Sequence, residues 1–262
     1  MRKWIELGWR PLLVITLLFI VWEVCISFFD VPDWLLPAPS QIFGLMISDW
    51  TNYSHHVFST VELVLIGFVI GSSVGVIVAI SLHLVPFLKQ SMYPLLILSQ
   101  NIPVIVLAPL LVIWFGFGIL PKIIVITLVC FFPIAIALLD GFRRTDRDLM
   151  HYMKMAGATK KQIFWKLEWP HALPSLFSGL KISATYSVMG AVISEWLGAS
   201  EGIGVYMTLA SSSFRTDRVF VAIFIIVALS LLFFLLIMWL EKMTIRWQAS
   251  EEGDSHGTSR NS

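Results

Sequence analysis

One serine of the chain stands in a pattern that hydrolases use to hold a nucleophile. Gly71-Ser72-Ser73-Val74-Gly75 matches the motif G-x-S-x-G, which places its serine on a sharp turn between a strand and a helix. Here the motif lies inside a long apolar run, and a serine nucleophile also needs a base within hydrogen-bonding reach. The six histidines all lie outside the apolar runs or at their ends: His55, His56, His83, His151, His171 and His256. Because Gly67, Gly71 and Gly75 recur at every fourth position, we favour a face for close helix packing over an intramembrane hydrolase that uses Ser73.

Other chemistry that short motifs can carry is missing from the sequence. No H-E-x-x-H zinc motif and no G-x-x-x-x-G-K-[ST] phosphate loop occurs. The two cysteines, Cys25 and Cys130, both lie in apolar runs and lack the spacing of metal ligands. We therefore expect a chain that is not an enzyme. We expect no catalytic residue, no metal site and no directly bound cofactor, and without a phosphate loop the chain could not bind and hydrolyse ATP by that route on its own.

Few ionisable side chains lie within the apolar runs, where such groups are costly and are often functional. Glu23 lies well inside the first run, whereas Glu62, Asp140 and Glu195 lie near the ends of theirs, where snorkelling or hydration lowers the cost of the charge. Glu23 either contacts a transported solute, or it is hydrogen-bonded to another helix or faces a water-filled cavity, and the sequence leaves these interpretations open. A carrier driven by protons or sodium would be expected to hold more such groups.

Small and polar residues recur in register along the fifth apolar run. Ser183, Ser187, Gly190 and Ser194 are spaced by four, three and four positions, so they share one face of a helix, with Tyr186 beside them. This face could line an aqueous translocation path, to which Glu23 could also contribute. The alternative is that serine and glycine make ordinary contacts between helices in a membrane.

The composition indicates which elements hold these residues. Of the 262 residues, 57% are hydrophobic and 13% are charged, and the mean hydropathy is +0.83, whereas soluble domains carry about 25% charged residues. The net charge of +1 gives no reason to expect a nucleic-acid partner. A membrane-spanning helix needs about 20 mainly apolar residues, and such runs lie at 11–29, 57–82, 91–113, 119–139, 176–197 and 219–240. We predict an all-α protein with about six transmembrane helices in the lipid bilayer, the first of them retained rather than cleaved as a signal peptide.

Lysine and arginine are distributed unevenly between the segments that join these runs. Assigning alternate segments to the two sides puts fifteen of the eighteen on one side and leaves Lys122, Arg215 and Arg218 on the other. Because cytoplasmic loops are enriched in these residues, both termini are predicted to be cytoplasmic. We expect residues 1–249 to form a transmembrane domain. Residues 250–262, which are rich in serine, glycine and charge, are predicted to be a disordered tail.

The segment between the first two runs, 30–56, is longer than a simple connection requires. Three prolines precede a group of apolar residues whose spacing suggests a short helix lying at the membrane interface. These apolar residues are Ile42, Phe43, Leu45, Met46 and Trp50.

The loop at 140–175, on the predicted cytoplasmic side, is the main hydrophilic segment. We predict a short helix from Arg147 to Ala156, ended by Gly157 in a left-handed conformation, and a second helix that starts at the capping box Thr159-Lys160-Lys161-Gln162. Ile163, Phe164 and Leu167 give this second helix an apolar stripe, and Pro170 and Pro174 are expected to end it before the fifth span. Such a pair of helices could dock in a groove of another protein or rest on anionic lipid, and the physical argument leaves both open.

At this loop the sequence resembles the permease subunits of binding-protein-dependent ATP-driven (ABC) importers. Their signature is Glu-Ala-Ala, three residues, Gly, nine residues, Ile, one residue, Leu-Pro. Gly157 and Pro170 have the required spacing, and Leu167 and Trp169 stand in the Ile and Leu positions. The sequence departs from the signature at His151-Tyr152-Met153, which replaces Glu-Ala-Ala.

Further stretches resemble the nitrate, sulfonate and taurine branch of that family. They include Leu36-Pro37-Ala38-Pro39-Ser40, Trp114-Phe115-Gly116 and Glu195-Trp196-Leu197-Gly198 with Gly202-Ile203-Gly204. Residues 184–196 and 214–220 are most similar to permeases for the pyrimidine precursor of thiamine. The resemblance implies a type I ABC importer permease in the bacterial plasma membrane. Sulfonate, taurine or nitrate are alternative solutes, and a self-sufficient secondary carrier is a further alternative.

The resemblance also implies partners and a coupling surface. A symmetric pair of permeases would carry one ATPase on each inner loop and receive solute from an extracytoplasmic binding protein. ATP binding would tilt the loop helices about Gly157 and switch the spans from inward-open to outward-open. The residues implied to couple to the ATPase are His151, Ala156, Gly157, Ala158, Thr159, Ile163, Phe164, Leu167 and Pro170.

Overall fold

The computed structural model describes residues 2–245, with side chains described from residue 9 onward. Within that range, five helices are long and apolar enough to cross a membrane: α1 (Arg2–Phe29), α3 (Trp50–Leu84), α6 (Ile119–Arg143), α9 (Trp169–Glu195) and α11 (Thr216–Thr244). The predicted all-helical membrane architecture is confirmed. The tail predicted at 250–262 lies outside the described residues.

The third predicted span is a broken pair of helices, so the expectation of one continuous helix over 91–113 is wrong. α4 (Pro86–Ser99) and α5 (Val104–Phe115) meet at an angle of 99°. The break falls at the residues before Pro103, which is the N-cap of α5. Proline disfavours the helical conformation in the residue that precedes it. Pro103 therefore ends one helix and starts another in a new direction.

The fifth predicted span, in contrast, is unbroken and longer than expected. α8 (Lys160–Ile163), the π-helical turn η1 (Phe164–Glu168) and α9 follow one another without a break, and Lys160–Glu195 forms one span of 36 residues. The prediction that Pro170 and Pro174 end the helix is wrong. The π turn ends just before Trp169 and Pro170, and the Trp169 amide bonds to the carbonyl of Phe164. This wider turn accommodates a proline that would clash in a regular helix.

The core forms around α6, which packs between α3 and α9. Gly67, Gly71 and Gly75 allow α3 to approach α6 closely: a Cβ atom added at Gly71 would lie 2.8 Å from Cys130 Cβ. On the other side, a Cβ added at Gly179 would lie 2.9 Å from the Pro133 carbonyl. The glycine spacing therefore acts in helix packing, which is the interpretation favoured from the sequence.

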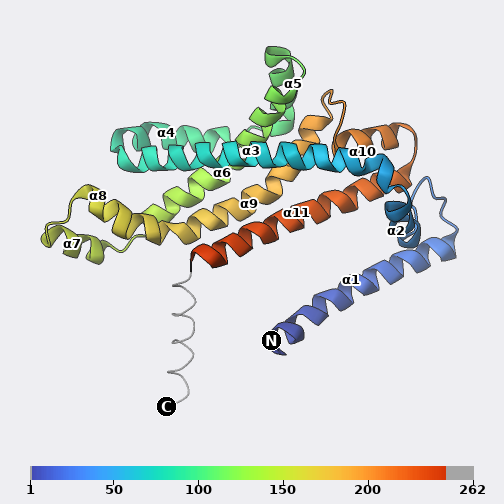
Figure 1. The fold of residues 1–262 in the computed structure, drawn as a ribbon, viewed down its shortest axis with the longest axis horizontal. Helices are drawn as coiled ribbons and strands as arrows, with labels where there is room; N and C mark the ends of the chain where they lie inside the picture. Colours follow the sequence, from blue (N-terminus) through green and yellow to red (C-terminus); the bar gives the residue numbers. More distant parts are fainter. Residues whose placement is uncertain (1, 246–262) are drawn as a thin grey trace.

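α1 lies largely apart from this bundle (Figure 1). It is joined to the rest by ring contacts such as Trp22 with Phe220 of α11 and by Glu23, whose carboxylate accepts hydrogen bonds from the amide and hydroxyl of Ser40. Ser40 belongs to the first turn of α2 (Pro39–Ser48), the short helix predicted before the second span. Glu23 thus caps the N-terminus of a neighbouring helix.

The two ends of the bundle carry different elements (Figure 1). One end holds α7 (Arg147–Met155) and α8, and the opposite end holds α2 and α10 (Ile203–Ser212). α10 is apolar but, at ten residues, too short to cross a membrane. We refer to Arg147–Ile163 as the hairpin and to these two regions as the hairpin end and the α10 end.

Candidate functional site: the hairpin and the helix that leaves it

The hairpin is built by local capping interactions, of which the Gly157 turn and the Thr159 capping box were predicted from the sequence. α7 starts at Asp146, whose carboxylate accepts hydrogen bonds from the amides of Asp148 (2.8 Å) and Leu149 (3.3 Å). It is followed by Gly157 at φ +79°, where the amide of Ala158 bonds to the Met153 carbonyl at 3.0 Å. This is the C-terminal geometry that glycine supports because it has no Cβ atom.

The second arm of the hairpin starts with the predicted capping box. The Thr159 amide donates to Gln162 Oε1 at 2.8 Å, and the Gln162 amide donates to Thr159 Oγ1 at 3.3 Å. Reciprocal bonds of this kind satisfy amides that the first turn of a helix leaves without partners. The direction in which the chain leaves Gly157 is therefore defined by side chains on both sides of it.

The exposed apolar surface of the hairpin lies on α7. None of the nine residues of α7 is buried, and Leu149, Tyr152 and Met155 are 51%, 68% and 82% exposed. They follow one another at three-residue spacing, so they share one face of the helix. Our sequence reasoning missed this face, although its spacing was visible in the sequence.

The predicted apolar stripe of the second helix faces inward instead. Ile163 and Phe164 are each 6% exposed, and Phe164 packs against the rings of Phe142 and Trp169. Leu167 and Pro170 are half-buried, whereas His151, Ala156, Gly157 and Thr159 are exposed. Ala158 is half-buried. The implied coupling residues therefore divide into an exposed group near Gly157 and a group that joins the hairpin to the core.

A largely buried pair connects the π turn to the end of α3. Glu168 Oε2 lies 3.0 Å from His83 Nε2, and the His83 ring stacks on Phe142 with ring centroids 4.2 Å apart. Both partners are largely buried, with side-chain exposures of 16% and 13%. The start of the long helix is thereby attached to two other spans directly behind the hairpin.

The residues proposed from the sequence to line a path in the fifth span pack against α6. Ser183, Ser187, Gly190 and Ser194 are buried, and Ser183 Oγ donates to the Cys130 carbonyl at 2.8 Å. Tyr186 is 44% exposed and does not join this buried group, and Glu23 lies on α1 with its oxygens on Ser40. The geometry within one chain therefore favours helix contacts for the serine and glycine face.

The motif around Ser73 shows no catalytic geometry. Ser73 is exposed, and its hydroxyl donates to the Val69 carbonyl of its own helix at 2.7 Å. Three histidines are engaged elsewhere: His56 with the Gly202 amide, His83 with Glu168, and His171 with the Arg144 carbonyl. Among the side chains described, those of residues 9–245, no cluster of three or more metal-ligating groups is found.

The α10 end holds a buried polar cluster that our sequence reasoning did not assign. Glu195, the last residue of α9, is 2% exposed. Its Oε1 accepts a hydrogen bond from Thr60 Oγ1 at 2.7 Å, and its Oε2 accepts from the Gly204 amide at 2.8 Å. The signal in the sequence was the resemblance of Glu195 and Gly202-Ile203-Gly204 to stretches of known permeases.

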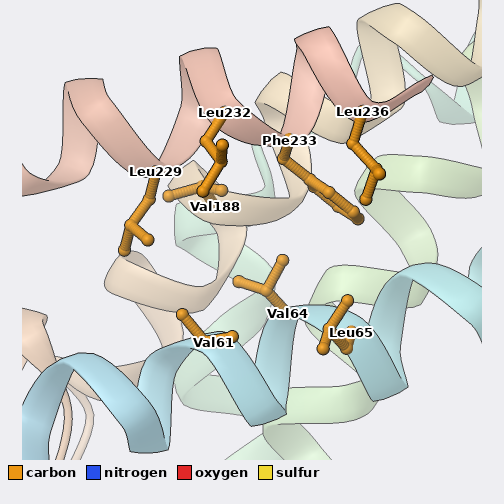
Figure 2. Close-up of a pocket in the computed structure, with 8 residues that line it drawn as sticks. All are labelled: Val61, Val64, Leu65, Val188, Leu229, Leu232, Phe233 and Leu236. Atoms are coloured by element: carbon orange, nitrogen blue, oxygen red, sulfur yellow. The ribbon is translucent and has the colours of Figure 1, made fainter. Parts of the chain in front are cut away.

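An apolar groove of about 230 Å³ opens between α3 and α11, with Val188 of α9 among the side chains that line it (Figure 2). Every side chain that lines it is a hydrocarbon: Val61, Val64, Leu65, Val188, Leu229, Leu232, Phe233 and Leu236. Such a surface offers no hydrogen bond to a polar solute. It suits lipid tails or another apolar helix, and we do not assign it to the translocation path.

Comparison with known proteins finds matches to subunits of membrane transport systems. Residues 67–246 match the family described as binding-protein-dependent transport system inner membrane component. The chain is 35% identical over 243 residues to the formylaminopyrimidine transport permease protein ThiX of Halalkalibacterium halodurans, covering 92% of this chain and 97% of the relative. It is 31% identical to the riboflavin transport system permease protein RibX of Chloroflexus aurantiacus, covering 95% and 92% of the two chains.

A third relative and a solved structure extend the comparison. The chain is 30% identical to the putative aliphatic sulfonates transport permease protein SsuC of Bacillus subtilis, covering 94% of this chain and 90% of the relative. A chain in the crystal structure of an amino acid ABC transporter with histidines superposes with a TM-score of 0.58 at 17% identity, covering 82% of this chain and 99% of the other. At that identity, the structural match supports the fold alone.

Proposed function

We propose, from the premise that this chain belongs to the family of binding-protein-dependent transport system inner membrane components, that it takes up a small heteroaromatic solute as the translocation subunit of an ABC importer. The relative at 35% identity is named for formylaminopyrimidine and another for riboflavin. Both names denote nitrogen heterocycles, which supports a pyrimidine related to the thiamine precursor as the solute. A sulfonate is the alternative solute, on the similarity to SsuC.

One observation carries the assignment of a coupling role to the hairpin. α7 presents an exposed apolar face, and the chain turns at Gly157 directly into a continuous helix of 36 residues. At 1.5 Å per residue this helix is about 54 Å long. A protein that docks on α7 and moves it would therefore also move the helix Lys160–Glu195, which runs from the hairpin end to the α10 end of the bundle (Figure 1). This arrangement favours protein docking over simple contact with lipid.

The other parts of the importer lie outside this chain. An ATPase would bind the hairpin in the cytoplasm, a second copy of the chain would complete the path, and an extracytoplasmic binding protein would deliver the solute at the α10 end. Both termini would then be cytoplasmic. ATP would be hydrolysed only by the partner, since the chain has no phosphate-binding loop of its own.

Gly157 offers a direct test of this function. A Cβ atom at Gly157 would meet no heavy atom within 4 Å, so a substitution is opposed only by the positive φ of +79°. β-Branched residues avoid this conformation, whereas asparagine tolerates it. We expect Gly157→Val to abolish ATP-dependent uptake and Gly157→Asn to retain most of it, with equal insertion of both variants in the membrane.

The measurement is uptake of radiolabelled formylaminopyrimidine into liposomes that contain the permease together with an ATPase and a binding protein, which would first have to be identified, for example among the neighbouring genes. Equal uptake by the Val and Asn variants would contradict the coupling role of the hairpin. Uptake by the permease alone, without ATPase or ATP, would identify a secondary carrier instead.

A further inference from the structure

The N-terminus of α10 is held by side chains from two other helices. The amide of Gly202, the N-cap, donates to His56 Nδ1 at 3.1 Å, and the amide of Ile203 donates to Thr60 Oγ1 at 2.8 Å. The amide of Gly204 completes the set by donating to Glu195. The first amides of a helix have no partners within that helix. Three consecutive ones are thus satisfied by α3 and by the end of α9.

Glu195 is the central member of this group. Thr60 is fully buried; its hydroxyl accepts from Ile203 and donates to Glu195, so both bonds depend on one side chain. Each carboxylate oxygen of Glu195 accepts a separate hydrogen bond, one from Thr60 and one from Gly204. A carboxylate beside these amides is also attracted by the positive end of the helix dipole.

The surrounding glycines show how closely the carboxylate fits. A Cβ atom at Gly202 would overlap the carboxyl group of Glu195, and one at Gly204 would lie 2.6 Å from the Val192 carbonyl. Gly202 also has a φ of +128°, which residues with a side chain rarely adopt. The backbone at Gly202 and Gly204 therefore packs so closely against Glu195 that a side chain at either position would not fit.

Glu195 is also the last residue of the helix that begins at the hairpin. A displacement of the hairpin would be carried along this helix to Glu195, and the hydrogen bonds would carry it to α10. We propose that Glu195 is a positioning residue that makes α10 move with the end of α9, so that the state of the hairpin sets the position of α10 during transport. The transport part of this inference rests on the proposed function, whereas the attachment of α10 does not.

Substitutions of Glu195 and Thr60 can remove individual hydrogen bonds that hold α10. Glutamine at position 195 has one acceptor oxygen and one donor nitrogen, so its nitrogen would face either the Thr60 hydroxyl or the Gly204 amide. Valine at position 60 keeps the shape of threonine but removes both bonds of the hydroxyl, whereas serine keeps the hydroxyl. Glu62, which is exposed on the same helix as Thr60, provides a matched carboxylate control in Glu62→Gln.

The attachment is tested first on the purified chain without partners. Hydrogen–deuterium exchange should be about tenfold faster at Gly202–Gly204 in Thr60→Val and Glu195→Gln, as expected when a buried hydrogen bond to a charged group is lost. Thr60→Ser and Glu62→Gln should exchange like the unmodified protein. Unchanged exchange in Thr60→Val and Glu195→Gln would overturn the attachment, whatever the chain transports.

The transport role is tested in the assembled importer. Glu195→Gln and Thr60→Val should bind the ATPase and hydrolyse ATP without solute at the unmodified rate, while solute uptake falls by at least about tenfold. Unmodified uptake in these variants, despite faster exchange at α10, would overturn the transport role. Loss of membrane insertion in Thr60→Val but not in Thr60→Ser would also overturn it, because the bonds would then serve folding only.

Discussion

Glu168 accepts a hydrogen bond from His83 across 3.0 Å, and this pair joins the π turn of the long helix to the end of α3. Both side chains are largely buried, so removing the carboxylate leaves a buried polar ring without its partner. We expect Glu168→Ala to lower the free energy of unfolding by roughly 1–3 kcal/mol. Thermal unfolding of the purified protein in detergent measures the change. Glu168→Gln keeps an acceptor oxygen and should lose less, and equal losses in the two variants would contradict the role of this bond.

Lys181 and Glu241 form a second link between long helices. Lys181 Nζ lies 2.9 Å from Glu241 Oε2, and the side chains are 24% and 22% exposed. Since Lys181 is on α9 and Glu241 on α11, reversing either charge places two like charges together. We expect Lys181→Glu or Glu241→Lys alone to cost roughly 1–3 kcal/mol of stability. The double variant should recover most of the loss in a double-mutant cycle, and additive losses would exclude a direct interaction.

Substitutions at Gly71 and Ser73 distinguish the packing interpretation of the G-x-S-x-G motif from the catalytic one. A side chain at Gly71 would meet Cys130 Cβ at 2.8 Å and the Thr127 backbone at 3.1 Å, so Gly71→Leu forces α3 away from α6. Overpacking of this kind costs about 1–3 kcal/mol or more. We expect little folded protein for Gly71→Leu, measured by size-exclusion chromatography, and unmodified yield and uptake for Ser73→Ala. A hydrolytic activity of the purified protein that is lost in Ser73→Ala would instead support the hydrolase alternative.

Features set by a few neighbouring residues could be predicted from the sequence. The start and end of α7, the left-handed Gly157 and the capping box at Thr159 depend on bonds within about five residues, and all were predicted. The apolar runs located the spans because the length of a crossing is set by the bilayer. The glycine spacing in α3 predicted a close approach to another helix, though not that this helix is α6.

Features that depend on distant partners could not be predicted in this way. A proline normally ends a helix, but Pro170 follows a π turn that is packed against α3 and α6 through His83 and Phe142. The sequence left open whether the face that contains Ser183 and Gly190 lines a path or contacts another helix, because polar spacing does not reveal which helix covers it. Glu195 was placed near the end of a span, but its partner Thr60 lies 135 positions away.

Gly204 gives a last prediction, on the fit of α10 against α9. An added methyl group would lie 2.6 Å from the Val192 carbonyl and 3.0 Å from Glu195 Cβ, so Gly204→Ala must push α10 away from the end of α9. We expect a loss of about 1–3 kcal/mol in stability and faster hydrogen exchange at Gly202–Gly204. Gly44→Ala, in the helix α2, is the matched control: its methyl group would meet no atom within 4 Å, and reduced freedom of the unfolded chain should make it neutral or stabilising by up to about 1 kcal/mol. If both alanine variants unfold at the same temperature as the unmodified protein, α10 does not pack as closely on α9 as these distances require.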